Sequence, residues 1–223
     1  MNQEIGLSCS LCEKRKEKRF CPAVHGRICP QCCGEQREVV LDCPSECPYL
    51  QQAREHERGR GLELVAESEL FPRVEISQQF VHEHEHLVLG LTYSLAKAAR
   101  ADHEIRDADL IATLKALARS YEMLSDSGLH YDQPITSLAG QAIASELAAS
   151  IKEYRETEQE HLGYSRLRDS DVLRVLVLVL RMAYSHTSGR PKSRGFIDFL
   201  YRQFPEEPLI ASSTSQSSRL IVP

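Results

Sequence analysis

The chain has 223 residues, of which 42% are hydrophobic, and its formal net charge at pH 7 is -5. This length allows one ordinary domain with an apolar core and a smaller unit beside it. The longest apolar run, Val175 to Leu180, is far shorter than the roughly 18 to 20 residues of a membrane span. The first residues have neither the basic start nor the apolar core of about 7 to 15 residues that a secretory signal needs, so we expect no such signal. We therefore expect a soluble, cytoplasmic protein with no membrane partner, whose net charge gives no general attraction to nucleic acid.

All eight cysteines lie within the first 47 residues. In a reducing cytosol such a dense group favours metal ligation over disulfide formation. The motif CxxC occurs at Cys9 and Cys12 and again at Cys29 and Cys32. Each CxxC turn directs two thiolates toward one point about 2.3 Å from each sulfur, which suits tetrahedral zinc. The spacing predicts a closed four-cysteine zinc site without an open position for a catalytic water.

The remaining cysteines interleave with these four and predict a second zinc ion; they are Cys21, Cys33, Cys43 and Cys47. We expect a segment of about 45 residues with few large apolar side chains to require such ions to fold. The pairing stays open, because His25 could replace one ligand and the adjacent Cys32 and Cys33 could exchange roles. An iron-sulfur cluster is the alternative, but the compact CxxCxxC run that is usual for such clusters is absent.

The predicted fold class is mainly α, with a small N-terminal binuclear zinc module followed by an all-helical bundle domain. The predicted parts are the module at residues 1–50, a partly helical linker at 51–72, the bundle at 73–205 and a Ser-rich disordered tail at 206–223. Apolar periodicity and caps predict helices from Ser77 through Ala98, from about Asp107 to Ser125, from Pro134 to about His161, from Asp169 through the apolar run, and from about Ser193 to Phe204. The Val-rich run could also form a strand, but no partner strand is predicted.

The segment CCGEQREVVLDCPSECPYL carries a resemblance to other proteins through Cys33, Gly34, Arg37, Cys43, Pro44, Cys47 and Tyr49. It resembles uncharacterised bacterial proteins with an N-terminal cysteine-rich, zinc-ribbon-like module and a helical C-terminal domain. The likeness extends to GRPKSRGFIDFL at residues 189–200. It implies that module and helical domain belong to one architecture, and it implies no activity.

Residues 82–86, HEHEH, match the HExxH pattern of zinc hydrolases. At about 100° per residue, His84 lies on the apolar side of its helix, whereas His82 and His86 face solvent. A low-ranked second metal site would combine His82, Glu83 and His86 with Glu122, which an antiparallel helix pair would bring level with His86. His84 is more simply explained as a core histidine with its hydrogen bonds satisfied.

The pattern ExxH occurs twice, at Glu83 to His86 and at Glu158 to His161. Di-iron bundles use this pattern on two of their helices. In a simple up-and-down bundle the two copies would lie roughly 25 Å or more apart along the axis, at about 1.5 Å per residue. Only a crossover connection would bring them together, so we do not expect a shared metal site.

Two basic segments could contact an anion or a nucleic acid. Arg190, Lys192 and Arg194 lie beside the start of the last helix, where free backbone N–H groups favour anions. The second segment is a loop of the module with five basic residues: Lys14, Arg15, Lys16, Lys18 and Arg19. Two glutamates within this loop reduce its net positive charge. Phe20 is the only aromatic side chain there that could stack on a base. The simpler alternative is solvated loop charges, or ion pairs with Glu206 and Glu207.

These features predict a zinc-binding, non-catalytic cytosolic adaptor or regulatory protein. It would bind a protein or RNA partner through its zinc module and helical domain, and the helical domain could also form a homo-oligomer. The alternatives are a nucleic-acid-binding protein that uses loops 14–19 and 190–194, and a metalloenzyme with a site in the bundle. An enzyme is poorly supported, because the sequence has neither a GxSxG nucleophile turn nor a GxxxxGKS phosphate loop.

Overall fold

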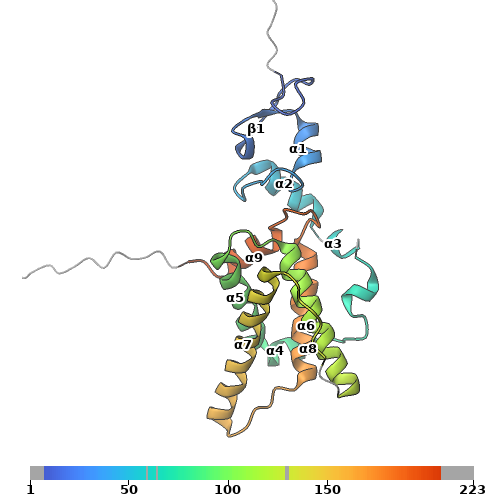
Figure 1. Cartoon of the computed structure of the whole chain (residues 1–223), viewed down its shortest axis with the longest axis vertical. Coiled ribbons are helices and arrows are strands. Elements are labelled where there is room, and N and C mark those ends of the chain that lie inside the picture. Colours follow the sequence, from blue (N-terminus) through green and yellow to red (C-terminus); the bar gives the residue numbers. More distant parts are fainter. Residues whose placement is uncertain (1–7, 59, 64, 129–130, 207–223) are drawn as a thin grey trace, which may run out of the picture.

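The computed structural model describes residues 8–58, 60–63, 65–128 and 131–206, and the described chain is mainly helical (Figure 1). A small cysteine-rich unit, the module, lies at one end of an elongated bundle of helices. The elements are β1 (Arg19–Cys21), β2 (Gly26–Ile28), α1 (Pro30–Gln36), α2 (Pro48–Glu57), α3 (Arg60–Glu63), α4 (Gln78–Glu83), α5 (Glu85–Ala101), α6 (Asp107–Ser127), α7 (Leu138–Leu162), α8 (Asp169–His186) and α9 (Gly195–Gln203), with 3-10 turns at Pro22–Val24 and Glu67–Leu70. Within the described chain, no helix combines the length and hydrophobicity needed to cross a membrane.

The module consists of a short hairpin and a short helix. Strands β1 and β2 pair antiparallel, with Arg19 opposite Ile28. Helix α1 follows the hairpin directly, because Pro30 suits the first helical position and the Sγ atom of Cys29 accepts a hydrogen bond from the backbone N–H of Cys32. The hairpin and the start of α1 therefore bring cysteines from separate parts of the sequence together.

The helices of the bundle largely follow the predicted caps. The hydroxyl of Ser77 accepts a hydrogen bond from the backbone N–H of Phe80 and caps α4. Helix α6 ends at Gly128 and α7 ends at Gly163, both in the left-handed conformation that glycine adopts without strain. The predicted helix from Ser77 is interrupted at His84, which separates α4 from α5.

The predicted start of the third helix at Pro134 is wrong. Helix α7 begins at Leu138, where the hydroxyl of Ser137 accepts a hydrogen bond from the backbone N–H of Gly140 at 3.0 Å. Before this cap, the backbone N–H of Gln133 donates to Ser120 of α6. The local hydroxyl cap and this tertiary contact outweigh the general preference of proline for a first helical turn.

The connection between α6 and α7 runs back along the bundle, so these two helices are parallel (Figure 1). Thr113, early in α6, lies beside Gly140, early in α7, and the Tyr121 ring lies near Arg155. Helices α5 and α7 are antiparallel instead, since Gly90 faces Ser150 and Lys97, later in α5, contacts Glu146, earlier in α7. The bundle is therefore not a simple up-and-down arrangement.

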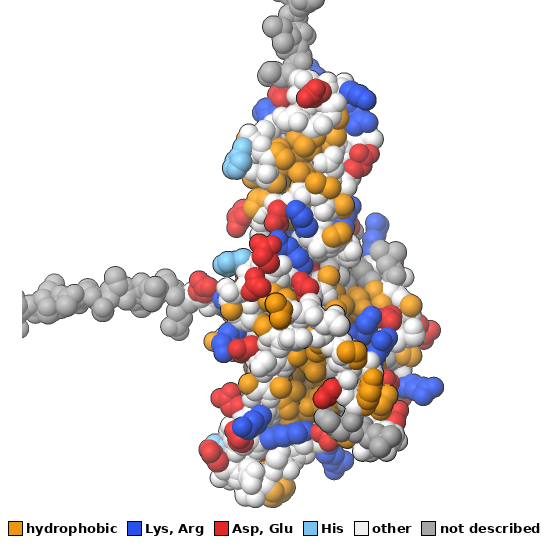
Figure 2. Space-filling view, viewed as in Figure 1, with side chains coloured by type: hydrophobic (Ala, Val, Ile, Leu, Met, Phe, Trp, Pro, Cys, Tyr) orange, Lys and Arg blue, Asp and Glu red, His pale blue; other side chains and the backbone are white. Residues whose placement is uncertain are grey.

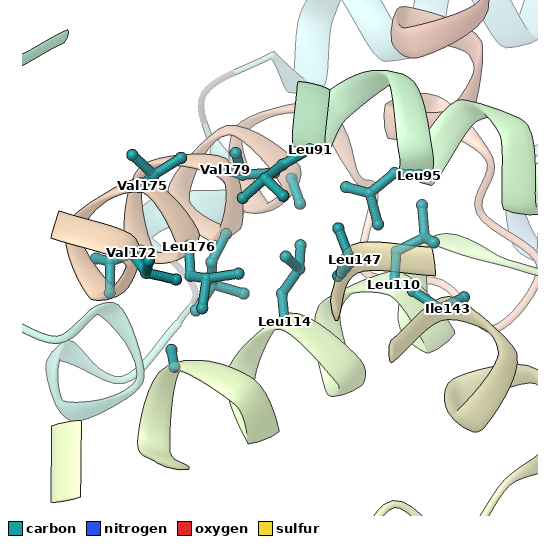
Figure 3. Close-up of a cluster of buried hydrophobic side chains, with 14 of the residues drawn as sticks. Leu91, Leu95, Leu110, Leu114, Ile143, Leu147, Val172, Val175, Leu176 and Val179 are labelled. Carbon is teal, nitrogen blue, oxygen red and sulfur yellow. The ribbon is translucent and has the colours of Figure 1, made fainter. Parts of the chain in front are cut away.

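The core lies between α5, α6, α7 and α8 (Figure 3). Leu91 and Leu95 of α5 point toward Leu147 of α7, and Leu114 of α6 lies across from Leu176 of α8. Burial of each such leucine contributes about 1.5–3 kcal/mol to folding. The Val-rich run belongs to α8, where all its residues but Leu178 are buried, so the helical interpretation of this run is confirmed.

At two of the predicted domain boundaries, the structure shows ordered elements or contacts. Helix α2 runs across the predicted boundary between the module (1–50) and the linker (51–72), and Leu50 is buried. At the other end, Glu206 forms an ion pair with Arg100 at 3.2 Å. The remainder of the predicted tail, residues 207–223 including Glu207, lies outside the described residues.

Candidate metal centre

The first cysteine group consists of Cys9, Cys12, Cys29 and Cys32, and the structure positions it to hold one metal ion. The four Sγ atoms all lie within 4.8 Å of one another. Cys9, Cys29 and Cys32 are 3% exposed or less, and Cys12 is partly exposed. Two CxxC turns that converge on one point give the arrangement that the spacing predicts.

The local backbone already favours thiolates at two of these positions. Burial raises the pKa of Cys9, but hydrogen bonds from the backbone N–H groups of Cys29, Cys12 and Leu11 outweigh it, so that the pKa falls to about 6. The backbone N–H of Cys32 likewise lowers the pKa of Cys29. Interaction with the Cys29 sulfur raises the pKa of Cys32 to about 12. A metal ion would displace the proton that the cluster keeps at Cys32.

Arg15 lies against this cluster rather than only in solvent. Its Nη1 atom is 3.9 Å from the Sγ atom of Cys29 and 4.0 Å from that of Cys32. The interaction with Cys29 raises the pKa of the guanidinium. Four thiolates around a divalent cation carry a net charge of -2, and a neighbouring cation offsets part of it. Arg15, which the sequence offered as a phosphate contact, is therefore a partner of the candidate metal ligands.

The second cysteine group consists of Cys21, Cys33, Cys43 and Cys47, and it is less compact. In the described part of the chain, no further set of three or more Cys, His, Asp or Glu ligand atoms lies within 4.8 Å of one another. Burial raises the pKa of Cys43, a hydrogen bond from the backbone N–H of Glu38 opposes this rise, and nearby Cys21 and Cys47 add to it. Arg19 donates to the Sγ atom of Cys33 at 3.6 Å.

His25 lies in the turn of the hairpin and is exposed. It is not part of the cluster formed by the first cysteine group. The adjacent Cys32 and Cys33 belong to different groups, since Cys32 joins Cys9 while Cys33 contacts Arg19. The structure thus assigns the first set of four as the sequence spacing does.

The candidate histidine site of the bundle does not assemble. The side chains of His82 and His86 are 85% and 81% exposed. The carboxylate of Glu83 accepts a hydrogen bond from the side chain of Gln79. Glu122 lines a cavity with Arg73 and Ser170 near the start of α8, whereas His86 lines one beside α7. His84 stacks on Phe80 with its Nδ1 atom 3.0 Å from the Phe80 carbonyl oxygen, as expected for a core histidine.

The expected separation of the two ExxH motifs is wrong. His86 and His161 line one cavity of about 540 Å³, and Glu83 and Glu158 line the neighbouring one of about 610 Å³. The crossover makes α5 and α7 antiparallel, so that the start of one lies beside the end of the other. Glu158 nevertheless accepts hydrogen bonds from Ser165 and from backbone N–H groups of the next loop, and the four side chains form no compact ligand set.

The basic residues before α9 contact backbone carbonyl groups. Arg190 donates to the carbonyl oxygens of Gly34 and Arg37 at 3.0 and 2.7 Å, and Lys192 donates to that of Val40 at 2.8 Å. Arg194 donates in the same way to His103 and Ile105. The guanidinium and ammonium groups thus have partners within the chain.

A carboxylate from another helix of the same chain occupies the N-terminal end of α9. The buried carboxylate of Asp107 accepts hydrogen bonds from the backbone N–H groups of Phe196 and Ile197 at 3.2 and 3.1 Å. The expectation that this helix end favours an anion is physically sound, but α6 supplies it. In the sequence, Asp107 is recognisable only as a helix start, because nothing local indicates its contact with a residue 89 positions away.

In the loop before β1, the lysines differ from the arginines. The Arg19 guanidinium lies over the Tyr49 ring, 4.5 Å from its centroid, besides contacting Cys33. Lys14, Lys16 and Lys18 are exposed. The three lysines therefore present their charges to solvent, whereas the exposed Arg15 also directs its guanidinium toward Cys29 and Cys32.

No family model, curated protein or solved structure matches this chain. The two segments that carry the sequence resemblance do contact each other, through Gly34 and Arg190.

Proposed function

We propose that this protein is a zinc-binding, non-catalytic adaptor or regulatory protein, and that its module binds two zinc ions and presents a surface to a protein partner. The observation that carries the proposal is the convergence of four largely buried sulfurs within 4.8 Å. Four thiolates complete the tetrahedral shell of zinc and leave no position for water or substrate. Such an ion stabilises a fold and does no hydrolysis.

Zinc is favoured over other metals by the donor set. Four thiolates from two CxxC turns suit zinc and also iron, but the compact CxxCxxC run that is usual for iron-sulfur clusters is absent. Folding supports a structural role: the module's buried cluster contains Ile28 and Leu41 beside the cysteines themselves. A unit with so little apolar core depends on metal binding for its stability.

A protein partner is favoured over RNA by the surface of the module. Phe20 is 56% exposed and Val40 is 64% exposed. Figure 2 shows hydrophobic side chains gathered on one face of the module. Exposed apolar groups beside charged ones are typical of protein interaction sites. The nucleic-acid alternative retains Lys14, Lys16 and Lys18, because the arginines of both basic segments are engaged within the chain.

The metal content of the purified full chain tests the first half of the proposal. We expect about two zinc ions per chain, fewer in Cys9→Ser, and an unchanged content in His86→Ala, which serves as the control. Cys29→Ser should unfold the module and leave the bundle helical by circular dichroism. Iron, no metal, or loss of an ion in His86→Ala would contradict the proposal, and the last result would support a metal site in the bundle.

Partner binding tests the second half. The zinc-loaded chain serves as bait, and any protein retained is then titrated against wild type, a Phe20→Ser/Val40→Ser variant and a Lys14→Ala/Lys16→Ala/Lys18→Ala variant. We expect the first variant to weaken binding at least tenfold and the second to have little effect. Binding of RNA that the lysine variant weakens and the Phe20→Ser/Val40→Ser variant does not would favour the nucleic-acid alternative. So would a plot of log affinity against log salt concentration with a slope of about -0.9 per duplex phosphate contact. Light scattering without a partner tests self-association, for which exposed Leu89 and Tyr93 on α5 provide a surface.

A further inference from the structure

Glu38 connects the second cysteine group to the helical domain. It lies in the loop between Cys33 and Cys43, it is 1% exposed, and its φ of 55° is a strained value for a residue with a side chain. Its backbone N–H lies near the thiol of Cys43, where it opposes the rise in pKa that burial causes. A buried carboxylate in a strained loop persists only where the surrounding contacts hold it.

Those contacts come from α2 and from the loop after α8. The Oε1 atom of Glu38 accepts from Nη2 of Arg54 at 2.7 Å, and Oε2 accepts from Oγ of Ser188 at 2.8 Å. The backbone carbonyl of Glu38 accepts from the backbone N–H of Lys192, also at 2.8 Å. Glu38 thus lies beside a candidate ligand, Cys43, and forms hydrogen bonds to the helical domain through its carboxylate and its carbonyl.

The segment between Cys43 and Cys47 meets the same part of the helical domain. Ser45 donates to the carboxylate of Asp198 in α9 at 2.7 Å, and the same carboxylate pairs with Arg54. The segment between Cys33 and Cys43 and the segment between Cys43 and Cys47 therefore both contact the helical domain. Fixing their ends in one metal site would lower the conformational entropy that docking costs.

The second group is also the more accessible and less preorganised of the two. Cys21, Cys33 and Cys47 are 7–8% exposed and Cys43 is partly exposed, against 3% or less for the three most buried ligands of the first group. No three of its sulfurs lie within 4.8 Å of one another, whereas all four of the first group do. Binding that must first draw ligands together is weaker, because part of the interaction energy orders them.

We propose that the zinc ion of Cys21, Cys33, Cys43 and Cys47 is the exchangeable one of the two, and that its occupancy holds the module against the helical domain through Glu38. This inference rests on the proposed zinc-binding function and adds its regulation. When the ion leaves, the loop around Glu38 loses its anchor at Cys33 and Cys43, and the contacts to Arg54, Ser188 and Lys192 open. Zinc availability would thereby set whether the two parts are docked.

A chelator challenge of the full zinc-loaded chain, followed by hydrogen exchange, tests the proposal. We expect one zinc equivalent to leave at least tenfold faster than the other. Its loss should speed amide exchange about tenfold at Lys192 and around Glu38, while α5 to α8 stay protected. Cys43→Ser should bind one ion fewer and show this faster exchange before any chelator is added.

Glu38→Gln keeps the coupling testable if Cys43→Ser does not fold. We expect it to retain both ions, to release the exchangeable one faster, and to expose the Lys192 amide. Glu35→Gln, an exposed glutamate on α1, should behave as wild type.

Four results are distinguishable. Loss of the faster ion without any change at Lys192 would overturn the coupling, and equal release rates would overturn the assignment of an exchangeable site. A single ion that Cys43→Ser retains and Cys9→Ser loses would remove the second site but leave the first. Absence of zinc from wild type would instead overturn the proposed function itself.

Discussion

The carboxylate of Asp107 at the start of α6 accepts a hydrogen bond from the hydroxyl of Ser193 at 2.8 Å, and both residues are buried. The same carboxylate accepts from the backbone N–H groups of Phe196 and Ile197. It therefore satisfies the start of α9 from another helix, and α9 in turn carries Asp198, which contacts the module.

Asp107→Ala should destabilise the protein strongly. It leaves the Ser193 hydroxyl and two backbone N–H groups buried without an acceptor, and each such loss costs about 1–3 kcal/mol. We expect a decrease of at least about 2 kcal/mol in the free energy of unfolding, measured by urea denaturation with zinc present. Asp126→Asn, an exposed change at the other end of α6, is the control and should have little effect.

The stability that Asp107 contributes should depend on pH. Burial raises its pKa above the ordinary value of 3.8, against the opposing hydrogen bonds from Ser193, Ile197 and Phe196. The folded state then keeps a proton at pH values where the unfolded state has lost it. This contribution is fully present below pH 3.8 and falls as pH rises through the folded pKa.

Asp107→Asn removes the titration with little change in volume. We expect the difference in unfolding free energy between wild type and this variant to favour wild type most at acid pH and to decrease as pH rises. Urea denaturation of both proteins from pH 4 upward measures it. A difference independent of pH, or one that grows with pH, would contradict the direction of the shift.

Gly195→Ala should lower the stability of the protein because the added Cβ atom would collide with a neighbouring backbone segment. A Cβ atom at this position would collide with the carbonyl oxygen of His186 at the end of α8. Moving that carbonyl disturbs the packing of α8 on α9, and overpacking of this kind costs roughly 1–3 kcal/mol. Thermal unfolding should show a lower Tm. Gly34→Ala is the matched control, since nothing lies within 4 Å of its Cβ position.

The antiparallel register of α5 and α7 predicts a specific rescue. Lys97 Nζ lies 2.9 Å from the Glu146 carboxylate. Lys97→Glu should lower the Tm slightly by placing two like charges together, and adding Glu146→Lys should restore it, with the effect shrinking at high salt. If the double variant is additive, the helices do not have this register.

The sequence alone determined the features that depend on local spacing. Two CxxC turns place Cys9, Cys12, Cys29 and Cys32 at one point because each turn fixes the direction of its own two sulfurs. The cap at Ser77, the helix ends at Gly128 and Gly163, and the helical state of the Val-rich run likewise depend on neighbouring residues.

Only the tertiary structure decided which side chains meet across the chain. The connection after α6 is long enough for either a hairpin or a crossover, and the crossover alone placed His86 beside His161. The sequence around a basic residue such as Arg15 or Arg190 does not indicate whether its side chain faces solvent, a thiolate or a carbonyl group. Their partners here are 14 and 156 residues away, and such contacts depend on how whole elements pack, which no local pattern records.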